Sequence, residues 1–383
     1  MAEEIVLTNE CKSRTIIHQV DLLKLRGGGV ETCIRDMITY APDDHVVRVV
    51  GVQGPENEAP LGRWTTVEVG GRHVQFMPAA RLGAPGPRRV PESIMLFMGL
   101  AKYRKLIRPT VVQAHRVETA AMAKLLFPRC HVIQFIHGDG LADLSGHSDS
   151  FWRFMPVAAR SLQWWAVKAA DQVHVFSAEG GRRFGRYRKD VRAWRTWYDP
   201  AIFFSETQES RSDDILWIGR LEPPKDPLLA LETLACLRTA GRSVRLTLVG
   251  SGGLMQKVHD ALVRLDLLSA VTLVPYLPRE EIAAAMRRHQ VLLMTSHYEG
   301  SPRVLIEALA CGMQVVATKE ADPDGVVRDR SPNLRVASRQ PSAIADVLNR
   351  VLTQSDPEIT DPDDGYEILP YSAPTLVAKI MST

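Results

Sequence analysis

The stretch VLLMTSHYEGSPRVLIEALACGMQVVAT, residues 291–318, predicts a strand, a turn, a helix and a second strand. Val291–Ser296 is a short apolar run typical of a buried strand. Ser301 followed by Pro302 predicts the helix start, because a serine hydroxyl can accept a first-turn N–H and proline is tolerated at the first helical position. Apolar residues then recur at helical spacing, and Gly312 closes the helix.

Two carboxylates flank this helix start. Glu299 lies in the turn before it, and Glu307 lies about 8 Å farther along the helix axis. The backbone N–H groups between them form an anion site at the positive end of a helix. The arrangement suits a nucleotide-diphosphate sugar, with one carboxylate for sugar hydroxyls and the other for a ribose. The alternative is an ordinary strand–turn–helix unit with two solvated glutamates.

Length and composition predict a globular protein of two domains, since the chain has 383 residues, 45% of them hydrophobic and 24% charged. A net charge of +3 is too small to indicate a nucleic-acid partner. The five cysteines are scattered and lack a C-x-x-C pair, which favours reduced thiols in a cytosolic protein and argues against a structural zinc.

The polar N-terminal residues and the shortness of the apolar runs predict a cytoplasmic protein. Residues 1–10 are polar and acidic rather than a secretory signal, and the apolar run Ile94–Ala101 is too short to span a bilayer. The amphipathic segment 93–108 and the basic run 182–195 could contact anionic lipid at the inner face of the cell membrane. The alternative is a core helix and a solvated basic face.

The first half alternates strands with helices and predicts a parallel, doubly wound sheet. Expected elements include a hairpin around Val67–Met77 and a helix over 151–170. Gly27-Gly28-Gly29 follow a strand and precede a helix, so their backbone can approach an anion closely. The alternative for these glycines is a flexible turn.

The second half repeats this architecture. The loop 219–226 follows one strand, the glycines 250–253 follow another, and 297–303 follow a third. Because ligands bind at the carboxyl ends of parallel strands, the three loops should meet around a diphosphate. Arg220 and Lys225 would stabilise it as a leaving group without a metal, although both could be solvated loop residues.

The domain boundary is expected in the polar segment 207–214. We therefore predict an N-terminal acceptor-side domain over 1–206 and a nucleotide-sugar-binding domain over 215–355. The tail 356–383 is expected to pack back on the N-terminal domain.

These motifs resemble those of the family 4 retaining glycosyltransferases. The resemblance rests on Gly219-Arg220 with Lys225-Asp226, on Gly250-Ser251-Gly252, and on Glu299 followed eight positions later by Glu307; Gly28-Gly29-Val30-Glu31 is similar to the family's N-terminal glycine loop. It implies an α/β chain of GT-B fold, with two Rossmann-like doubly wound domains facing across a cleft. It also implies transfer with retention, no bound metal and no cofactor.

The resemblance assigns roles to residues. Arg220 and Lys225 would bind the diphosphate, Glu307 the ribose, and Glu299 with the 300–303 backbone the sugar, while Val274–Leu277 would lie near the base. The implied donor-binding set is Gly28, Gly29, Gly219, Arg220, Lys225, Gly250, Gly252, Tyr276, Leu277, Glu299, Gly300, Ser301, Arg303, Val304 and Glu307. The implied catalytic set is His137, Arg220, Lys225 and Glu299.

His137 ends a strand in the first half, where the family often has a histidine touching the donor sugar. The alternative is a structural histidine in a glycine turn. No general base is assigned, because in the mechanism usually proposed for the family the leaving phosphate takes the acceptor's proton.

The chain departs from the family pattern at two places, 196–200 and 321–325. Two Asp-Pro-Asp turns, 322–324 and 361–363, have the Asp-x-Asp spacing of metal-dependent transferases of another fold, but solvated turns are expected there. His137, Asp139, Asp143, His147 and Asp149 fit no standard metal-ligand spacing.

The resulting interpretation is a metal-independent retaining hexosyltransferase, a mannosyltransferase or glucosyltransferase acting in cell-envelope or polysaccharide assembly. Its donor would be of the GDP-mannose or UDP-glucose type and its acceptor a glycan or glycolipid. Two alternatives stay open: a sugar-nucleotide epimerase on the same fold, and a non-catalytic sugar-nucleotide-binding protein.

Overall fold

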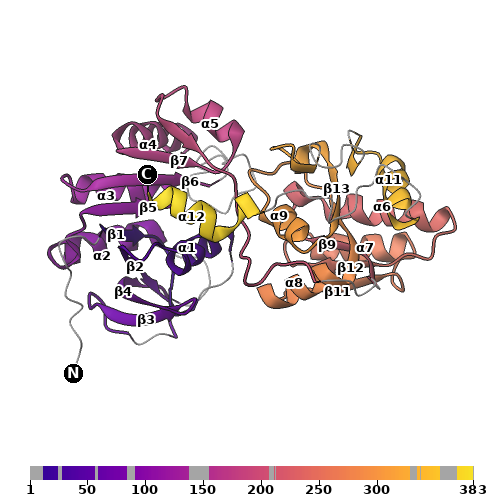
Figure 1. The fold of residues 1–383 in the computed structure, drawn as a ribbon, viewed down its shortest axis with the longest axis horizontal. Helices are drawn as coiled ribbons and strands as arrows, with labels where there is room; N and C mark the ends of the chain where they lie inside the picture. Colours follow the sequence, from indigo (N-terminus) through magenta and orange to yellow (C-terminus); the bar gives the residue numbers. More distant parts are fainter. Residues whose placement is uncertain are drawn as a thin grey trace. The chain divides into compact units, whose positions relative to one another are not determined.

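The structure is a computed structural model that describes residues 12–24, 28–56, 59–83, 91–137, 155–206, 211, 213–327, 334–336, 338–353 and 369–382. Two compact units divide the chain (Figure 1). One comprises Met1–Arg195 together with Leu376–Thr383, and the other comprises Thr196–Thr375.

The first unit is built on an eight-stranded sheet of order β3-β4-β2-β1-β5-β6-β7-β8. Only β3 runs antiparallel to its neighbour, as one half of the hairpin that the sequence predicts around 67–77. The strands are β1 (Lys12–Ile17), β2 (His45–Gln53), β3 (Thr65–Val69), β4 (Arg72–Arg81), β5 (Val111–Ala114), β6 (His131–Ile136), β7 (Gln172–Val175) and β8 (Val191–Ala193).

The second unit contains a wholly parallel six-stranded sheet of order β11-β10-β9-β12-β13-β14. Numbered within the unit, this is the 3-2-1-4-5-6 order of Rossmann-type sheets. The strands are β9 (Asp213–Ile218), β10 (Leu246–Val249), β11 (Val271–Val274), β12 (His289–Met294), β13 (Gln314–Thr318) and β14 (Arg335–Val336).

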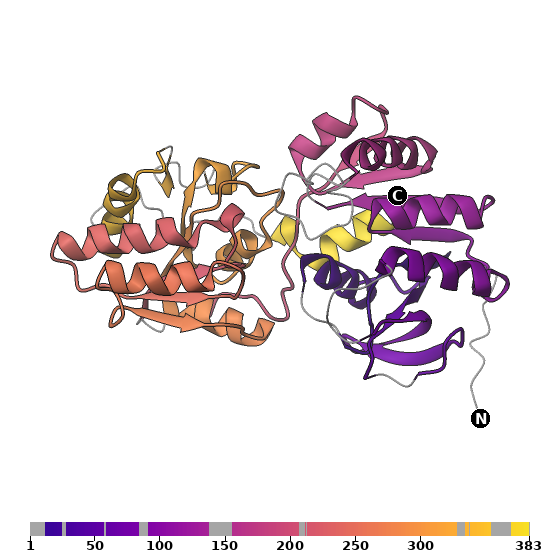
Figure 2. The same ribbon diagram turned by 180° about the vertical axis from the view of Figure 1, so that it is seen from behind.

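Helices cover both faces of each sheet, as the two opposite views show (Figures 1 and 2). In the second unit, α8 and α9 lie toward the viewer in Figure 1, and α6 and α7 do so in Figure 2. The α-helices include α1 (Gly29–Thr39), α2 (Glu92–Ile107), α3 (Val117–Leu126), α4 (Pro156–Ala169), α5 (Ala178–Phe184), α6 (Pro227–Thr239), α7 (Met255–Arg264), α8 (Arg279–Arg288), α9 (Arg303–Ala310), α11 (Pro341–Thr353) and α12 (Ala373–Met381).

Both central sheets are apolar because they are covered on two sides. The middle strands β9 and β12 carry residues with almost no exposed surface, such as Leu216 and Leu292. The doubly wound α/β prediction is therefore confirmed for each unit. None of the helices in the described ranges is both long and apolar enough to cross a bilayer.

The units divide at Arg195 and Thr196, ahead of the polar segment 207–214 in which the sequence predicts the boundary. The segment 196–203 belongs to the second unit because Tyr198 and Phe203 are buried in its core. The C-terminal residues return to the first unit, where His45 Nε2 lies 3.1 Å from the Met381 carbonyl oxygen.

Candidate functional site

The candidate site of the second unit lies where its strand order reverses. β9 and β12 are neighbours in the sheet, but the chain leaves β9 toward β10 and leaves β12 toward β13. In sheets of this kind, ligands usually bind beside such a reversal, at the carboxyl ends of the strands. The loops 219–226 and 295–302 emerge there, as the sequence predicts.

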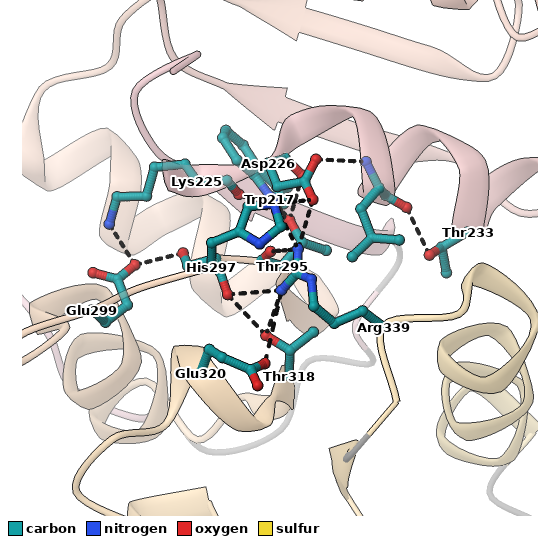
Figure 3. Close-up of polar contacts among 12 residues, drawn as sticks. Trp217, Lys225, Asp226, Thr233, Thr295, His297, Glu299, Thr318, Glu320 and Arg339 are labelled. Atoms are coloured by element: carbon teal, nitrogen blue, oxygen red, sulfur yellow. Dashed lines mark hydrogen bonds and ion pairs between the residues drawn. The ribbon is translucent and has the colours of Figure 1, made fainter. Parts of the chain in front are cut away.

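Lys225 and Glu299 meet across these loops (Figure 3). The Lys225 ammonium donates to Glu299 Oε1 at 2.5 Å, and the Ser296 hydroxyl donates to the same oxygen at 2.6 Å. The two charged side chains are only 25% and 10% exposed. The pair thus places one cation and one carboxylate side by side in a partly desolvated position, where each acts strongly on a bound ligand.

A second set of contacts fixes the backbone behind this pair. The Trp217 indole donates to the Thr295 hydroxyl at 2.9 Å, and that hydroxyl donates to the backbone carbonyls of Lys225 and Asp226 at 3.1 and 2.8 Å. Thr295 is fully buried. The loop after β12 is consequently tied to the loop after β9.

Arg339, which belongs to neither loop, donates hydrogen bonds to both of them (Figure 3). Its guanidinium donates to Asp226 Oδ2 at 2.6 Å and to the carbonyls of Thr295 and Ser296 at 2.8 and 2.9 Å. Asp226 also caps α6, as predicted, by accepting from the Leu229 N–H at 3.3 Å. One arginine therefore joins two site loops to a helix cap.

The glycines after β10 allow a close approach between backbones. A Cβ on Gly250 would lie 1.8 Å from the Gly219 carbonyl oxygen, and one on Gly252 would lie 2.5 Å from the Leu221 carbonyl oxygen. The Leu221 N–H donates to the Ser251 carbonyl at 2.9 Å. Both predicted glycines thus hold their loop against 219–221 at the edge of the site.

Glu307 lies on α9 and is 9% exposed. Its Oε1 lies 3.7 Å from Arg303 Nε and 4.0 Å from Arg279 Nη2. Arg279 begins α8 and also pairs with Asp199 at 3.7 Å. The buried carboxylate predicted to bind a ribose is therefore held between two guanidinium groups.

Ser301 does not cap the helix, which corrects one sequence prediction. The helix begins at Arg303, its N-cap is Pro302, and no side chain caps it. The Ser301 hydroxyl instead accepts from the Thr196 N–H at 3.2 Å. The hydroxyl is engaged by a distant segment, which a local capping rule does not anticipate.

The remaining residues predicted to bind the sugar donor differ in solvent exposure. Arg220 is 72% exposed and pairs with Glu222 at 2.7 Å, while Tyr276 is 68% exposed. Leu277 and Val304 pack partly against the core of the second unit. Gly300, between Glu299 and Ser301, is half-buried.

The other predicted residues belong to the first unit. Gly28 and Gly29 are exposed at the start of α1, and a Cβ on either would meet nothing within 4 Å. His137 follows β6 directly, and its Nε2 lies 2.9 Å from His115 Nδ1. Its ring also stacks on Phe176, with ring centroids 4.7 Å apart.

The possible metal ligands differ from those weighed in the sequence. Asp322 is 1% exposed, so the 322–324 turn buries this carboxyl instead of solvating it. Asp361, Asp363, Asp139, Asp143, His147 and Asp149 lie outside the described residues. In the described part of the chain, Cys33, His115 and His137 gather as one group with ligand atoms close together.

Sequence reasoning missed the residues that brace the site: Trp217, Thr295, Arg279 and Arg339. Trp217 and Thr295 lie in or beside apolar strands and look like core positions. Arg339 stands just before α11, far along the chain from the loops it joins. Only the Trp217 indole, in the strand just before Gly219-Arg220, offered a signal, since a buried Trp N–H requires a hydrogen-bond partner.

Two family models match the chain in succession. The model described as Glycosyltransferase Family 4 matches residues 27–201, and the model described as Glycosyl transferases group 1 matches residues 199–361. The second match contains the Lys225–Glu299 pair, Arg339 and Glu307. The first contains Gly28, Gly29 and His137.

Similar curated proteins include a D-inositol 3-phosphate glycosyltransferase of Frankia alni, 35% identical over 41% of this chain and 41% of that protein. A glycogen synthase of Mycobacterium tuberculosis is 25% identical over 64% of this chain and 60% of that protein. The matched regions thus span less than two thirds of either relative.

Solved structures resemble nearly the whole chain. Sucrose-phosphate synthase of Thermosynechococcus elongatus has a TM-score of 0.75 at 17% identity and covers 97% of both chains. The Anabaena protein HepE in complex with UDP and glucose has a TM-score of 0.69 at 15% identity, covering 97% of this chain and 98% of that one. At such identities the likeness shows the fold.

Proposed function

Because the chain belongs to the family 4 glycosyltransferases and has the GT-B fold, we propose that it transfers a hexose from a nucleotide-diphosphate sugar to a glycan or glycolipid acceptor. The observation that carries the proposal is the Lys225–Glu299 pair at the strand-order reversal of the second sheet. A cation there suits the diphosphate, and a carboxylate 2.5 Å away suits sugar hydroxyls.

The same residues suggest how the reaction proceeds. Lys225 and the exposed Arg220 would neutralise the departing diphosphate, so that electrostatic stabilisation takes the place of a metal. Glu299 would fix the sugar through its hydroxyls, and Glu307 would hold the ribose. The acceptor oxygen would bond the anomeric carbon on the face from which the diphosphate departs as the bond to the diphosphate breaks, and the leaving phosphate would take the acceptor's proton; attack on that face gives transfer with retention.

A UDP-linked glucose-type donor is favoured over GDP-mannose. HepE is described in complex with UDP-glucose, and an Escherichia coli trehalose-6-phosphate enzyme structure is described as bound with UDP-2-fluoro glucose. Both share the fold of this chain. We infer an acceptor of cell-envelope or polysaccharide assembly, the setting expected from the sequence.

Calorimetry with UDP, GDP, ADP and their sugars, each with and without EDTA, tests the donor. We expect one nucleotide family to bind, with the same affinity in EDTA. Lys225→Ala should weaken diphosphate binding by roughly tenfold or more while leaving nucleoside binding nearly unchanged. Lys168→Ala, an exposed lysine on α4, is the matched control. If no nucleotide binds, the proposal fails.

Product analysis separates the two alternatives. An epimerase would convert the sugar nucleotide without an acceptor, and a non-catalytic protein would bind a donor but turn over with none of the acceptors offered. A transferase should release nucleotide diphosphate in proportion to glycosylated acceptor. Retention is checked by the anomeric configuration of that product.

We also infer that the first unit contacts anionic membrane through α2, α3 and α4. These helices expose Ile94, Met98, Leu125, Trp164 and Trp165 and line an apolar pocket of about 320 Å³. Lys102, Arg104, Lys105 and Arg108 are exposed beside them at the end of α2. Apolar and basic side chains in one place suit a lipid surface with negative headgroups.

Within the basic run 182–195, Arg188 does not contribute to this surface, because it is committed elsewhere. Its guanidinium binds Asp190 and the carbonyls of Val167 and Asp171. Sedimentation with anionic vesicles should show binding that weakens with salt and with Met98→Gln combined with Trp164→Gln. Binding that is absent, or insensitive to both changes, would exclude the membrane contact.

A further inference from the structure

Three metal-ligating side chains gather at the strand-order reversal of the first sheet. Cys33 Sγ and one ring nitrogen each of His115 and His137 all lie within 4.8 Å of one another. Cys33 is 3% exposed and His115 is 2% exposed, while His137 is half-buried. The group therefore has two buried members and one half-buried member.

The fold brings these residues together from three separate elements. Cys33 lies on α1, His115 directly follows β5, and His137 directly follows β6. Strands β5 and β6 are parallel neighbours, so their carboxyl ends lie side by side. The three residues form no short sequence motif, which is why ligand spacing along the chain does not reveal them.

The donor atoms suit a transition-metal ion of the zinc type. One sulfur and two imidazole nitrogens are the ligands that Zn²⁺ prefers, whereas Mg²⁺ and Ca²⁺ require oxygen. A neutral imidazole is the form that binds a metal.

The separation of the two histidine nitrogens needs only a small change. His115 Nδ1 and His137 Nε2 are 2.9 Å apart, and two nitrogens on a tetrahedral zinc are separated by about 3.3 Å. The other ring nitrogen of His115 lies 2.8 Å from the Gln113 amide. Half a turn of that amide would present its oxygen to the His115 Nε2–H, the outer-shell contact that orients metal-bound histidines.

We propose that Cys33, His115 and His137 form a reversible site for Zn²⁺ or a similar transition-metal ion. On binding, the Cys33 thiol loses its proton to the buffer and its sulfur bonds the metal. The hydrogen bond between the histidines breaks, the Nδ1 proton of His115 moves to Nε2, and each imidazole gives one lone pair. The oxidation state of the metal does not change.

Such a metal would act against the transfer reaction rather than promote it. It would occupy His137, the first-unit residue expected to touch the donor sugar, and it would tie α1 to the edges of β5 and β6. Metal binding itself does not depend on the proposed function, so the two can be tested separately.

The site is tested by titrating the full chain, freed of metal by a chelator, with Co²⁺ and then with Zn²⁺ in competition with a chromophoric chelator. We expect one equivalent of Co²⁺ with thiolate-to-cobalt absorption, displaced by Zn²⁺. Cys33→Ser should remove this absorption and weaken Zn²⁺ binding by more than about tenfold, and Gln113→Leu should weaken it by about tenfold. Circular dichroism verifies that each variant is folded.

Cys236→Ser is the matched control, because Cys236 is a free cysteine in the second unit. It should leave both titrations unchanged. Absence of thiolate-to-cobalt absorption in the wild-type chain would overturn the proposal, even if Cys33→Ser fails to fold. Zn²⁺ binding of equal strength in wild type and Cys33→Ser would likewise overturn it, since the ion would then occupy unrelated surface ligands.

Discussion

Gly250 and Gly253 stand in the same loop after β10, but their surroundings differ. A Cβ on Gly250 would lie 1.8 Å from the Gly219 carbonyl oxygen, and the Gly250 φ angle is +151°. A Cβ on Gly253 would meet nothing within 4 Å. One glycine is therefore required by a backbone contact at the candidate site, and the other is not.

This difference predicts the stability of two alanine variants. Gly250→Ala should lower the free energy of unfolding by roughly 2–4 kcal/mol, because it combines an unfavourable φ angle with displaced backbone. Gly253→Ala should change it by less than about 0.5 kcal/mol. Urea unfolding of both variants measures the two values, and equal effects would contradict the assigned contact.

His174 makes the free energy of unfolding depend on pH. Burial, together with Arg192 and Arg14, lowers its pKa to about 3, and neither ring nitrogen has a hydrogen-bond partner among the described residues. The unfolded chain takes up a proton near pH 6.5, whereas the folded chain does not. The stability from this neutral imidazole is therefore present above pH 6.5 and is lost as the pH falls toward 3.

The expected loss can be isolated by substitution. Between pH 7 and pH 5, His174 alone should cost the wild-type chain about 2 kcal/mol of unfolding free energy. His174→Phe, which keeps a ring against Phe135 and Trp194, should lack this part of the loss. Urea unfolding at both pH values gives the difference, with the exposed His259→Gln as control. An unchanged pH dependence in His174→Phe would refute the assignment.

At the scale of elements, the site depends on how loops are joined at the sheet edge. The loops after β9 and β12 meet through a backbone hydrogen bond from the His297 N–H to the Pro224 carbonyl at 2.8 Å. Thr295 and Arg339 add further connections through side chains. Such contacts hold Lys225 opposite Glu299 before any ligand arrives, which lowers the ordering cost of binding.

Arg339→Gln should therefore affect both stability and binding. Losing the pairing with Asp226 and the carbonyls of Thr295 and Ser296 should lower the free energy of unfolding by roughly 2–4 kcal/mol. Nucleotide affinity should also fall, although Arg339 is not assigned to the ligand. Denaturation and calorimetry check the two effects. Arg264→Gln, on the exposed side of α7, should change neither.

Local chemistry explains what the sequence could predict about these elements. Asp226 before Pro227 caps α6 as expected, because a cap involves only neighbouring residues. Lys225 and Glu299 could be placed together because the carboxyl ends of parallel strands share an edge. Arg339 and Arg279 could not be found this way, since their partners are selected by tertiary packing between distant segments. Ser301 failed as a predicted cap for the same reason.

At the scale of the whole molecule, both units repeat one plan with different chemistry at the strand-order reversal. The first carries His115 and His137 there, and the second carries Lys225 and Glu299. Alternating strands and helices were enough to predict both sheets. The boundary at Arg195 and Thr196 was not predicted, because polarity along the chain does not reveal that Tyr198 and Phe203 belong to the second core.

The return of the C-terminal residues to the first unit has a consequence for synthesis on the ribosome. Arg14 lies in β1 with 6% of its surface exposed, and its guanidinium donates to the carbonyl of Met381, 367 residues later. β1 therefore leaves the exit tunnel long before the segment that it contacts. The second unit lies between them in the chain and can form during translation, whereas the first reaches its final form only after the residues around Met381 have emerged.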